Sequence, residues 1–172
     1  MDALTATHSF TLLSGVKAVV RELTGKEQRI LSRTVKGENA ADKLNQMLAS
    51  ILVSVGEVKN ITPEFVQQML TEDRRYALTV ARQFSMDFAP EFTFGWEYMD
   101  GSDKRVEEMT VNLDEGNFPS KPYKTQWETY PTEDERWVEI VLPKSGLKAK
   151  FKLLDGQGEQ VAAATKEAEL ST

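Results

Sequence analysis

One short pattern occurs near both ends of the chain, and it limits the fold more than any other feature of the sequence. Residues 14–28 read SGVKAVVRELTGKEQ, and residues 145–159 read SGLKAKFKLLDGQGE. In each copy a Ser-Gly pair lies between an apolar segment and a segment of alternating polarity, which is typical of a β-hairpin. The pattern predicts a strand–turn–strand unit at each end of the chain. The alternative is a chance similarity, because Ser-Gly pairs between strands are common.

Apolar residues between these two units recur every three or four positions, which indicates amphipathic helices. Four helices are expected, at residues 25–35, 40–54, 63–70 and 71–84. Thr24 and Glu27 have the spacing of a capping box, and Thr62 before Pro63 is a typical helix start. A compact four-helix unit is therefore expected in the centre of the chain.

The period of the apolar pattern changes to two after residue 88. Residues 92–98 read FTFGWEY, and this alternation is typical of a strand with one aromatic face. The aromatic residues on that face are Phe92, Phe94, Trp96 and Tyr98. Asp100-Gly101 is a hairpin-turn signal, so a second strand is expected at residues 104–113. We expect the aromatic face to belong to the core and to pack against the helices.

A long loop is expected at residues 114–135, because its prolines interrupt regular strand pairing. Its aromatic residues are Phe118, Tyr123, Trp127 and Tyr130. Aromatic side chains in such a loop either fold back over the sheet or anchor a partner protein, since they supply a large contact area. Both interpretations stay open, and these four residues form the candidate protein interface.

The expected fold class is α+β, with a central small helical bundle and antiparallel β-hairpins at the N-terminus and in the C-terminal half. The last two strands are expected at residues 137–142 and 147–154. The expected divisions are a lead-in and hairpin at 1–23, a four-helix unit at 24–88, an antiparallel β region with the long loop at 89–157, and a flexible tail at 158–172.

Composition argues against several classes of function. The chain has 172 residues, a net charge of −6, no cysteine and one histidine, His8. It has no clustered basic stripe of the kind that binds nucleic acid. Without cysteine it can form neither a disulfide nor a thiolate metal site. A helix that spans a bilayer needs about 20 apolar residues, and no apolar run in the sequence approaches this length. We therefore expect neither nucleic acid nor a membrane as a partner.

Motifs that carry catalysis are also missing from the sequence. It contains no Gly-x-Ser-x-Gly nucleophile elbow and no Gly-Lys-Ser/Thr phosphate loop. The acidic runs at residues 107–108 and 133–135 are interpreted as solvated loops, because paired-carboxylate catalysis needs an enclosed cleft. We therefore expect no catalytic residues, no cofactor and no bound metal. A carboxylate-dependent hydrolase would instead show a pocket with convergent acids.

Several short motifs follow one another along residues 10–157. They are L-x-S-G followed by L-T-G-x-E-Q at residues 12–28, I-T-P-E at 61–64, Asp-Arg at 73–74, the aromatic strand at 91–98, and L-P-x-S-G followed by L-L-D-G at 142–156. This order resembles that of baseplate and baseplate hub assembly proteins of contractile-tailed phages. In many members of that family a cysteine-bearing knuckle follows the aromatic strand, whereas residues 99–102 read MDGS here and carry no thiol.

The resemblance implies a non-enzymatic protein that is assembled in the host cytoplasm, enters the tail baseplate of the virion and binds other tail proteins. Several copies in a symmetric assembly are expected. One alternative stays open: an assembly chaperone that binds tail proteins and leaves before the particle is complete. The expected contact surfaces are the hairpin edges and the loop at residues 118–130, because an unpaired edge strand accepts a further strand.

Overall fold

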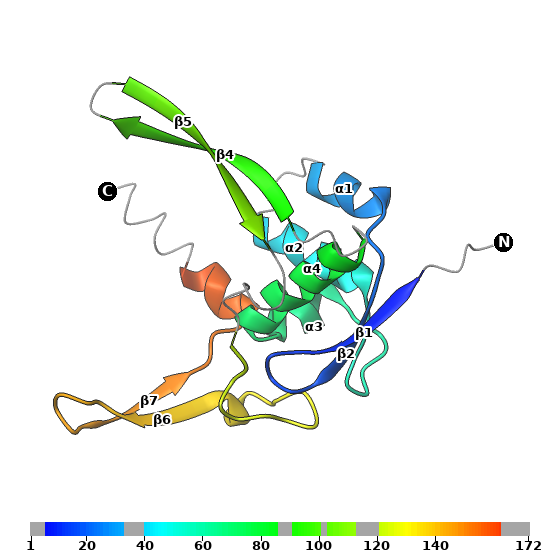
Figure 1. Ribbon diagram of the computed structural model, residues 1–172. Coiled ribbons are helices and arrows are strands. Elements are labelled where there is room, and N and C mark those ends of the chain that lie inside the picture. Colours follow the sequence, from blue (N-terminus) through cyan, green and yellow to red (C-terminus); the bar gives the residue numbers. More distant parts are fainter. Residues whose placement is uncertain (1–5, 33–39, 86–90, 101–102, 113–120, 163–172) are drawn as a thin grey trace.

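The computed structural model describes residues 6–32, 40–85, 91–100, 103–112 and 121–162 (Figure 1). Its fold class is α+β, as expected, with antiparallel strands in open sheets. The helices are α1 (Gly25–Ser32), α2 (Ala40–Ile51), α3 (Pro63–Gln68), α4 (Thr71–Ser85) and the short 3-10 helix η1 (Asp134–Arg136). The strands are β1 (Thr7–Thr11), β2 (Lys17–Arg21), β3 (Leu52–Val55), β4 (Glu91–Asp100), β5 (Asp103–Asn112), β6 (Trp137–Val141) and β7 (Lys148–Lys152).

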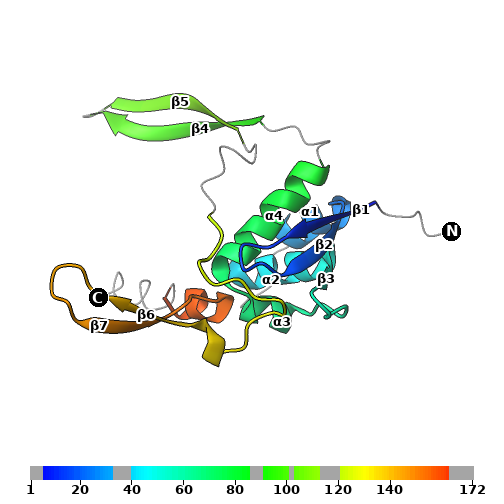
Figure 2. The same ribbon diagram turned by 60° about the horizontal axis from the view of Figure 1, so that its bottom comes forward.

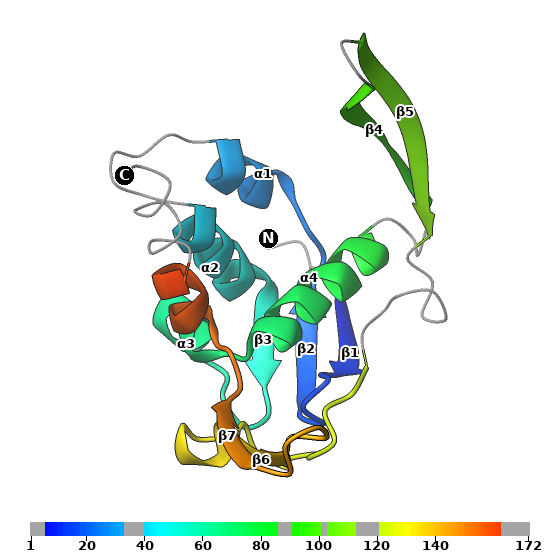
Figure 3. The same ribbon diagram turned by 90° about the vertical axis from the view of Figure 1, so that its left-hand side faces the viewer.

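The body of the molecule consists of a small sheet and the four α-helices. Strands β1, β2 and β3 form this sheet in sequence order, and both pairs are antiparallel. Helices α2 and α4 lie across one face of the sheet (Figure 3). The core between them is fully apolar at its centre, with Val20, Leu48 and Ile51 completely buried. Each fully buried side chain of this kind stabilises the folded state by about 1.5–3 kcal/mol.

Strand β3 corrects the helix expected at residues 40–54. Helix α2 ends at Ile51, and Leu52 and Val55 pair with Val20 and Ala18 of β2. Valine is β-branched and favours extended backbone, which explains the change at this point of the chain. The apolar spacing in this segment fits either structure, so it did not distinguish them. The central unit therefore includes a strand that completes the sheet of the N-terminal hairpin.

Within the described residues, the other expected helices and strands are confirmed with shifts of a few residues at their ends; residues 33–35 of the first expected helix and residue 113 of the strand expected at 104–113 lie outside the described part of the chain. The capping box is present: the Thr24 amide donates to the Glu27 carboxylate at 2.7 Å. The Thr62 hydroxyl accepts from the Phe65 amide at 3.3 Å and so caps α3. Of the expected tail, residues 158–162 continue a helix that begins at residue 156; residues 163–172 lie outside the described part of the chain.

Glu27 also connects three elements of the body. Its Oε1 accepts hydrogen bonds from Arg21 of β2 at 2.6 Å and from Ser50 of α2 at 2.8 Å. Burial alone would raise the pKa of the Glu27 carboxyl, but the hydrogen bonds from Arg21, Thr24 and Ser50 outweigh it and lower this pKa from 4.5 to about 2. The ionised form is therefore favoured by folding.

The lowered pKa of Glu27 gives the stability a definite dependence on pH. Its contribution is complete above about pH 4.5, the ordinary pKa, and is lost as the pH falls toward about 2. We expect Glu27→Gln to lower the free energy of unfolding at pH 7 by roughly 2 kcal/mol and to remove this part of the acid dependence. Chemical denaturation between pH 2 and pH 7 measures both effects. Glu57→Gln, at an exposed carboxylate, is the control for loss of one charge.

Both Ser-Gly pairs form hairpin turns, as the repeated pattern predicts. The backbone angle φ is positive at both glycines, 92° at Gly15 and 68° at Gly146. The Leu12 amide closes the first turn and the Leu142 amide closes the second, with hydrogen bonds of 2.9 and 2.8 Å to the residue after each glycine. The second turn is one residue longer. Glycine is favoured at both positions because other residues rarely adopt positive φ.

The two turns have different surroundings, which leads to a matched prediction. A Cβ atom at Gly15 would lie 2.7 Å from the side-chain oxygen of Gln126, whereas nothing lies within 4 Å at Gly146. We expect Gly15→Ala to lower the free energy of unfolding by about 3 kcal/mol, and Gly146→Ala by about 1, because only the first adds a steric clash to the backbone strain. Equal losses in chemical denaturation would contradict this explanation.

Two hairpins project from the body. Strands β4 and β5 pair along their whole length, from Glu91 with Asn112 to Asp100 with Asp103. Strands β6 and β7 form the second hairpin. Both extend beyond the helices and the three-stranded sheet (Figures 1 and 2). Trp96 on β4 is 53% exposed, so the expectation that this side chain is buried against the helices is wrong.

Candidate protein-interaction site

The predicted interface loop, in its described part from residue 121 to 133, lies against the turn of the N-terminal hairpin. The Tyr123 amide donates to the Leu13 carbonyl at 3.0 Å, and the Trp127 amide donates to the Ser14 carbonyl at 2.9 Å. The rings of Tyr123 and Trp127 meet nearly edge to face, with centroids 6.2 Å apart. Trp127 is partly buried against the core. The loop thus closes the body over this turn.

Tyr130 anchors the other end of this loop. Its hydroxyl accepts a hydrogen bond from the Leu70 amide at 2.7 Å and donates one to Asp73 Oδ2 at 3.1 Å. The second carboxylate oxygen, Asp73 Oδ1, accepts from the Ser14 amide at 3.0 Å. Asp73 is completely buried. One carboxylate therefore connects α4, the first turn and the loop.

Burial changes the ionisation of these groups. It raises the pKa of the Asp73 carboxyl, although the hydrogen bonds from Ser14 and Tyr130 act in the opposite direction. Burial also raises the pKa of the Tyr130 hydroxyl well above its ordinary value, and the nearby Asp73 carboxylate adds to this increase. The phenol therefore keeps its proton and remains a hydrogen-bond donor.

The described aromatic residues of the loop pack onto the body. Tyr123, Trp127 and Tyr130 all fold back onto the body, and Phe118 lies outside the described residues. Tyr130 has its hydroxyl committed to the hydrogen bonds above. Tyr123 and Trp127 remain partly exposed, so their contact with a partner stays a prediction. The larger exposed apolar surface lies elsewhere.

The projecting hairpins carry apolar side chains that sequence reasoning did not assign to an interface. On β4 and β5 the exposed ones are Trp96, Met99, Val106 and Met109. On β6, β7 and their turn they are Trp137, Ile140, Val141, Leu147 and Phe151. The sequences of both hairpins show alternating apolar and polar residues, which indicates strands with one apolar face. This pattern is the same whether the protein core or a partner protein covers that face, so it did not reveal an interface.

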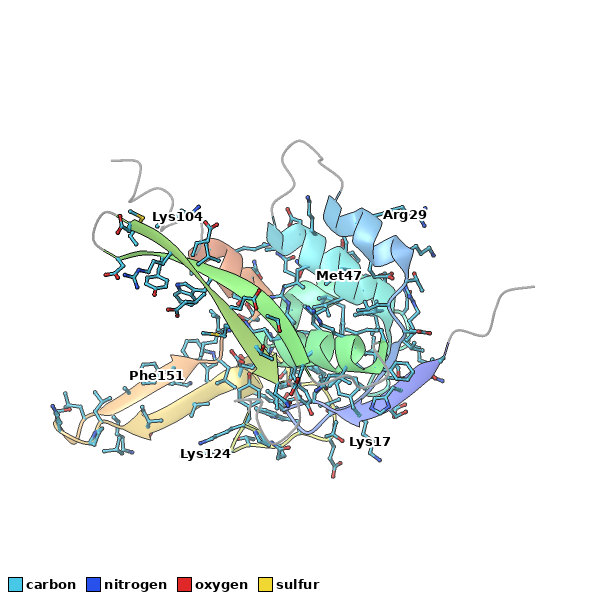
Figure 4. All side chains as sticks on the ribbon, turned by 45° about the horizontal axis from the view of Figure 1, so that its top comes forward. Lys17, Arg29, Met47, Lys104, Lys124 and Phe151 are labelled. Atoms are coloured by element: carbon cyan, nitrogen blue, oxygen red, sulfur yellow. The ribbon has the colours of Figure 1, made fainter. Side chains whose placement is uncertain are left out.

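One face of the β6–β7 hairpin is apolar, and the other carries the lysines of β7 together with Trp137 and Val141 of β6. Val138 pairs with Phe151, and Ile140 pairs with Ala149, so these side chains share a face. Phe151 is half exposed and lies on the projecting hairpin, far from Met47 in the helical body (Figure 4).

The three lysines of β7 lie on the opposite face of this hairpin. Lys150 lies over the ring of Trp137, with its Nζ 5.3 Å from the centroid. Lys148 forms an ion pair with Glu139 at 3.2 Å, and Lys152 donates to a carboxylate of the loop before β6. These side chains are solvated, so their ion pairs contribute little to stability.

Both faces of the β4–β5 hairpin carry acidic side chains, and one of them also carries the exposed ring of Trp96. Trp96 pairs with Glu107, and the register places Trp96 and Tyr98 on the same face as Met109, whereas the side chains of Phe92 and Phe94 lie outside the described part of the chain. Glu91, Glu97 and Glu108 lie on the other face. The hairpin as a whole, residues 91–112, carries six acidic and two basic residues, which gives a net charge of −4.

The C-terminal hairpin is attached to the body through buried charged side chains. Arg136 donates to the Pro131 carbonyl at 3.0 Å and to Asp155 Oδ2 at 3.2 Å. The backbone of Asp155 forms an isolated antiparallel bridge with Leu70, between α3 and α4. These contacts fix the base of the hairpin while its strands extend into solvent.

The helix that starts at residue 156 is held by a buried arginine of α4. Arg74 is 1% exposed and donates to Asn45 of α2 and to Glu159, both at 2.6 Å. Burial lowers the pKa of the Arg74 guanidinium, and Glu159 raises it in part. Gly156 packs directly on this guanidinium.

Comparison with family models, with curated proteins and with solved structures found no match to this chain. Within the described ranges, no group of three histidine, aspartate or glutamate residues has the geometry to hold a metal ion. No helix in the same part of the chain combines the length and apolar character needed to cross a bilayer.

Proposed function

We propose that this protein is a structural adaptor of a phage contractile-tail baseplate or hub and that it binds other tail proteins through its two projecting hairpins. The observation that supports this proposal is the exposure of large apolar side chains on both hairpins, including Trp96 at 53% and Phe151 at 50%. Apolar side chains gathered on one projecting element are typical of surfaces that a partner covers.

The architecture supports the same role. A two-stranded hairpin alone is marginally stable in water, and a third strand or a packed face stabilises it. Both projecting hairpins have two strands among the described residues. The base of the β6–β7 hairpin is held by the body through Arg136 and Asp155, so this hairpin presents a rigid end to a neighbour at little cost in conformational entropy. The motif order that resembles baseplate proteins assigns these neighbours to the phage tail.

The test is assembly of tails with altered hairpins. Trp96→Ser on β4 and Phe151→Ser on β7 remove exposed apolar side chains, and each is expected to reduce the yield of complete tails at least tenfold, by electron microscopy and infectivity. Val53→Ser changes an exposed valine on the body, 42% accessible, and is the matched control. Normal yields with all three variants would disprove a role for the hairpins.

Mass spectrometry of purified particles distinguishes the two roles that remain open. Peptides of this chain in a fixed ratio to tail-tube peptides identify a component of the particle. Their absence, together with the loss of tails in the hairpin variants, identifies a chaperone that acts during assembly and leaves. Cross-links from the hairpins to other tail proteins would name the partners directly.

A further inference from the structure

We propose that β4 of one copy adds to the free edge of β7 in a second copy, which gives an intermolecular sheet in the order β5-β4-β7-β6. This inference deepens the proposed function, because it names one partner of the hairpins as the same chain. Each hairpin is a separate two-stranded sheet, so β4 and β7 each have one edge without a strand partner among the described residues. Such an edge pairs readily with another strand.

The alternation of the two strands allows their charged residues to share one face of a common sheet. Along β7 the order is Lys-Ala-Lys-Phe-Lys, and along β4 it is Glu-Phe-Thr-Phe-Gly-Trp-Glu-Tyr up to residue 98. Side chains alternate between the two faces of a sheet. In a shared sheet the Lys face of β7 therefore continues the face of β4 that carries Glu91 and Glu97. Phe151 then joins the aromatic face that includes Trp96.

The charges favour this pairing over contacts between two identical edges. Strands β6 and β7 carry three lysines and one glutamate, a net charge of +2, whereas residues 91–112 carry −4. Two β7 edges would place lysines opposite lysines, and two β4 edges would place glutamates opposite glutamates. Like charges directly across a sheet are destabilising, and opposite charges stabilise it. Lysine at an edge normally prevents strand addition, and the acidic face of β4 removes that obstacle.

The existing ion pairs of these lysines do not block the contact. Lys148 is paired with Glu139, and the Lys148 side chain is 74% exposed. Lys104 on the other hairpin is paired with Glu97 and is 62% exposed. Solvated pairs of this kind exchange at little cost in free energy. They can therefore be replaced by pairs across the new interface.

The two edges in this contact are different, so the interface is heterologous. Each copy offers one β4 edge and one β7 edge, and both can be occupied at once. Copies then join head to tail, and such a contact generates a closed ring if the rotation between copies closes, or an open chain if it does not. A symmetric tail assembly with several copies uses this type of contact.

The test is the association of the purified full-length chain, measured by sedimentation velocity across concentration and salt. We expect assemblies larger than a dimer that weaken as salt rises, because the charges are exposed. A first variant carries Lys148→Glu, Lys150→Glu and Lys152→Glu. A second carries Glu91→Lys, Glu97→Lys and Glu108→Lys. Each alone is expected to associate at least about tenfold more weakly.

Mixing the two variants gives the decisive result. Each has edges of one sign, so each associates only weakly with itself, but the acidic edges of the first match the basic edges of the second. An equimolar mixture is therefore expected to recover association, which a misfolded variant cannot do. The control replaces Lys17, Lys59 and Lys124, exposed lysines outside both hairpins, with glutamate and is expected to associate normally.

Two outcomes would overturn the inference. One is a wild-type chain that stays monomeric at all concentrations, and the other is association that persists in both variants or fails to return in their mixture. These results are independent of the adaptor role. If the chain is monomeric in solution but is found in tails, only the self-association is contradicted. If the chain self-associates but neither enters nor affects tails, only the adaptor role is contradicted.

Discussion

Asp73→Ala is expected to lower the free energy of unfolding by roughly 4 kcal/mol, more than any other single change considered for this protein. The carboxylate is completely buried and accepts hydrogen bonds from the Ser14 amide and the Tyr130 hydroxyl. Alanine would leave both donors buried without this acceptor and would create a small cavity. The loss would act on the first turn and on the loop at residues 121–133 together.

Chemical denaturation measures the loss from Asp73→Ala, and two further variants show its origin. Glu72→Ala changes the neighbouring residue of α4, whose carboxylate is 49% exposed and forms a solvated ion pair with Arg75 at 3.2 Å. This variant is expected to lose less than about 0.5 kcal/mol. Tyr130→Phe removes one of the two donors and is expected to lose about 1–2 kcal/mol. A loss for Asp73→Ala no larger than that for Glu72→Ala would show that the buried contacts contribute little.

Gly156→Ala is expected to lower the free energy of unfolding by about 3 kcal/mol. A Cβ atom there would lie 2.5 Å from Arg74 Nη1 and 2.8 Å from the Gln67 carbonyl oxygen. The carbonyl belongs to the backbone of α3, and the guanidinium is held by Asn45 and Glu159. Neither neighbour can move without breaking other contacts, so the helix from residue 156 would separate from α4.

Limited proteolysis locates the effect of Gly156→Ala, because separation exposes the chain after residue 155 before the body unfolds. Gly25→Ala is the matched control: nothing lies within 4 Å of a Cβ at that position, and alanine is favoured over glycine in a helix. It is expected to be neutral or slightly stabilising. Early cleavage in both variants would show that the steric contact at Gly156 is not the cause.

Local signals in the sequence predicted the elements whose stability depends on nearby residues. Thr24 with Glu27, and Thr62 with Pro63, set the starts of α1 and α3 through hydrogen bonds within one turn. The glycine at position 15 predicted its hairpin because the turn itself requires positive φ. In each case the physical cause lies within a few residues of the signal, so a pattern in the sequence can reveal it.

Features that depend on distant residues were not predictable in this way. Strand β3 forms because β2 offers an edge to Leu52–Val55, and the apolar spacing of that segment fits a helix equally well. The exposed position of Trp96 depends on where the whole hairpin lies. The buried role of Asp73 depends on Ser14 and Tyr130, which are 59 and 57 residues away along the chain.

The attachment of the C-terminal hairpin has a mechanical consequence. Arg136 and Asp155 lie at the base of the hairpin, and Asp155 is bridged to Leu70 at the junction of α3 and α4. A pulling force applied to β6 or β7 therefore passes into the best-packed part of the molecule, where Leu70 is completely buried. Tension on this arm would therefore be resisted by the body and not by a peripheral turn.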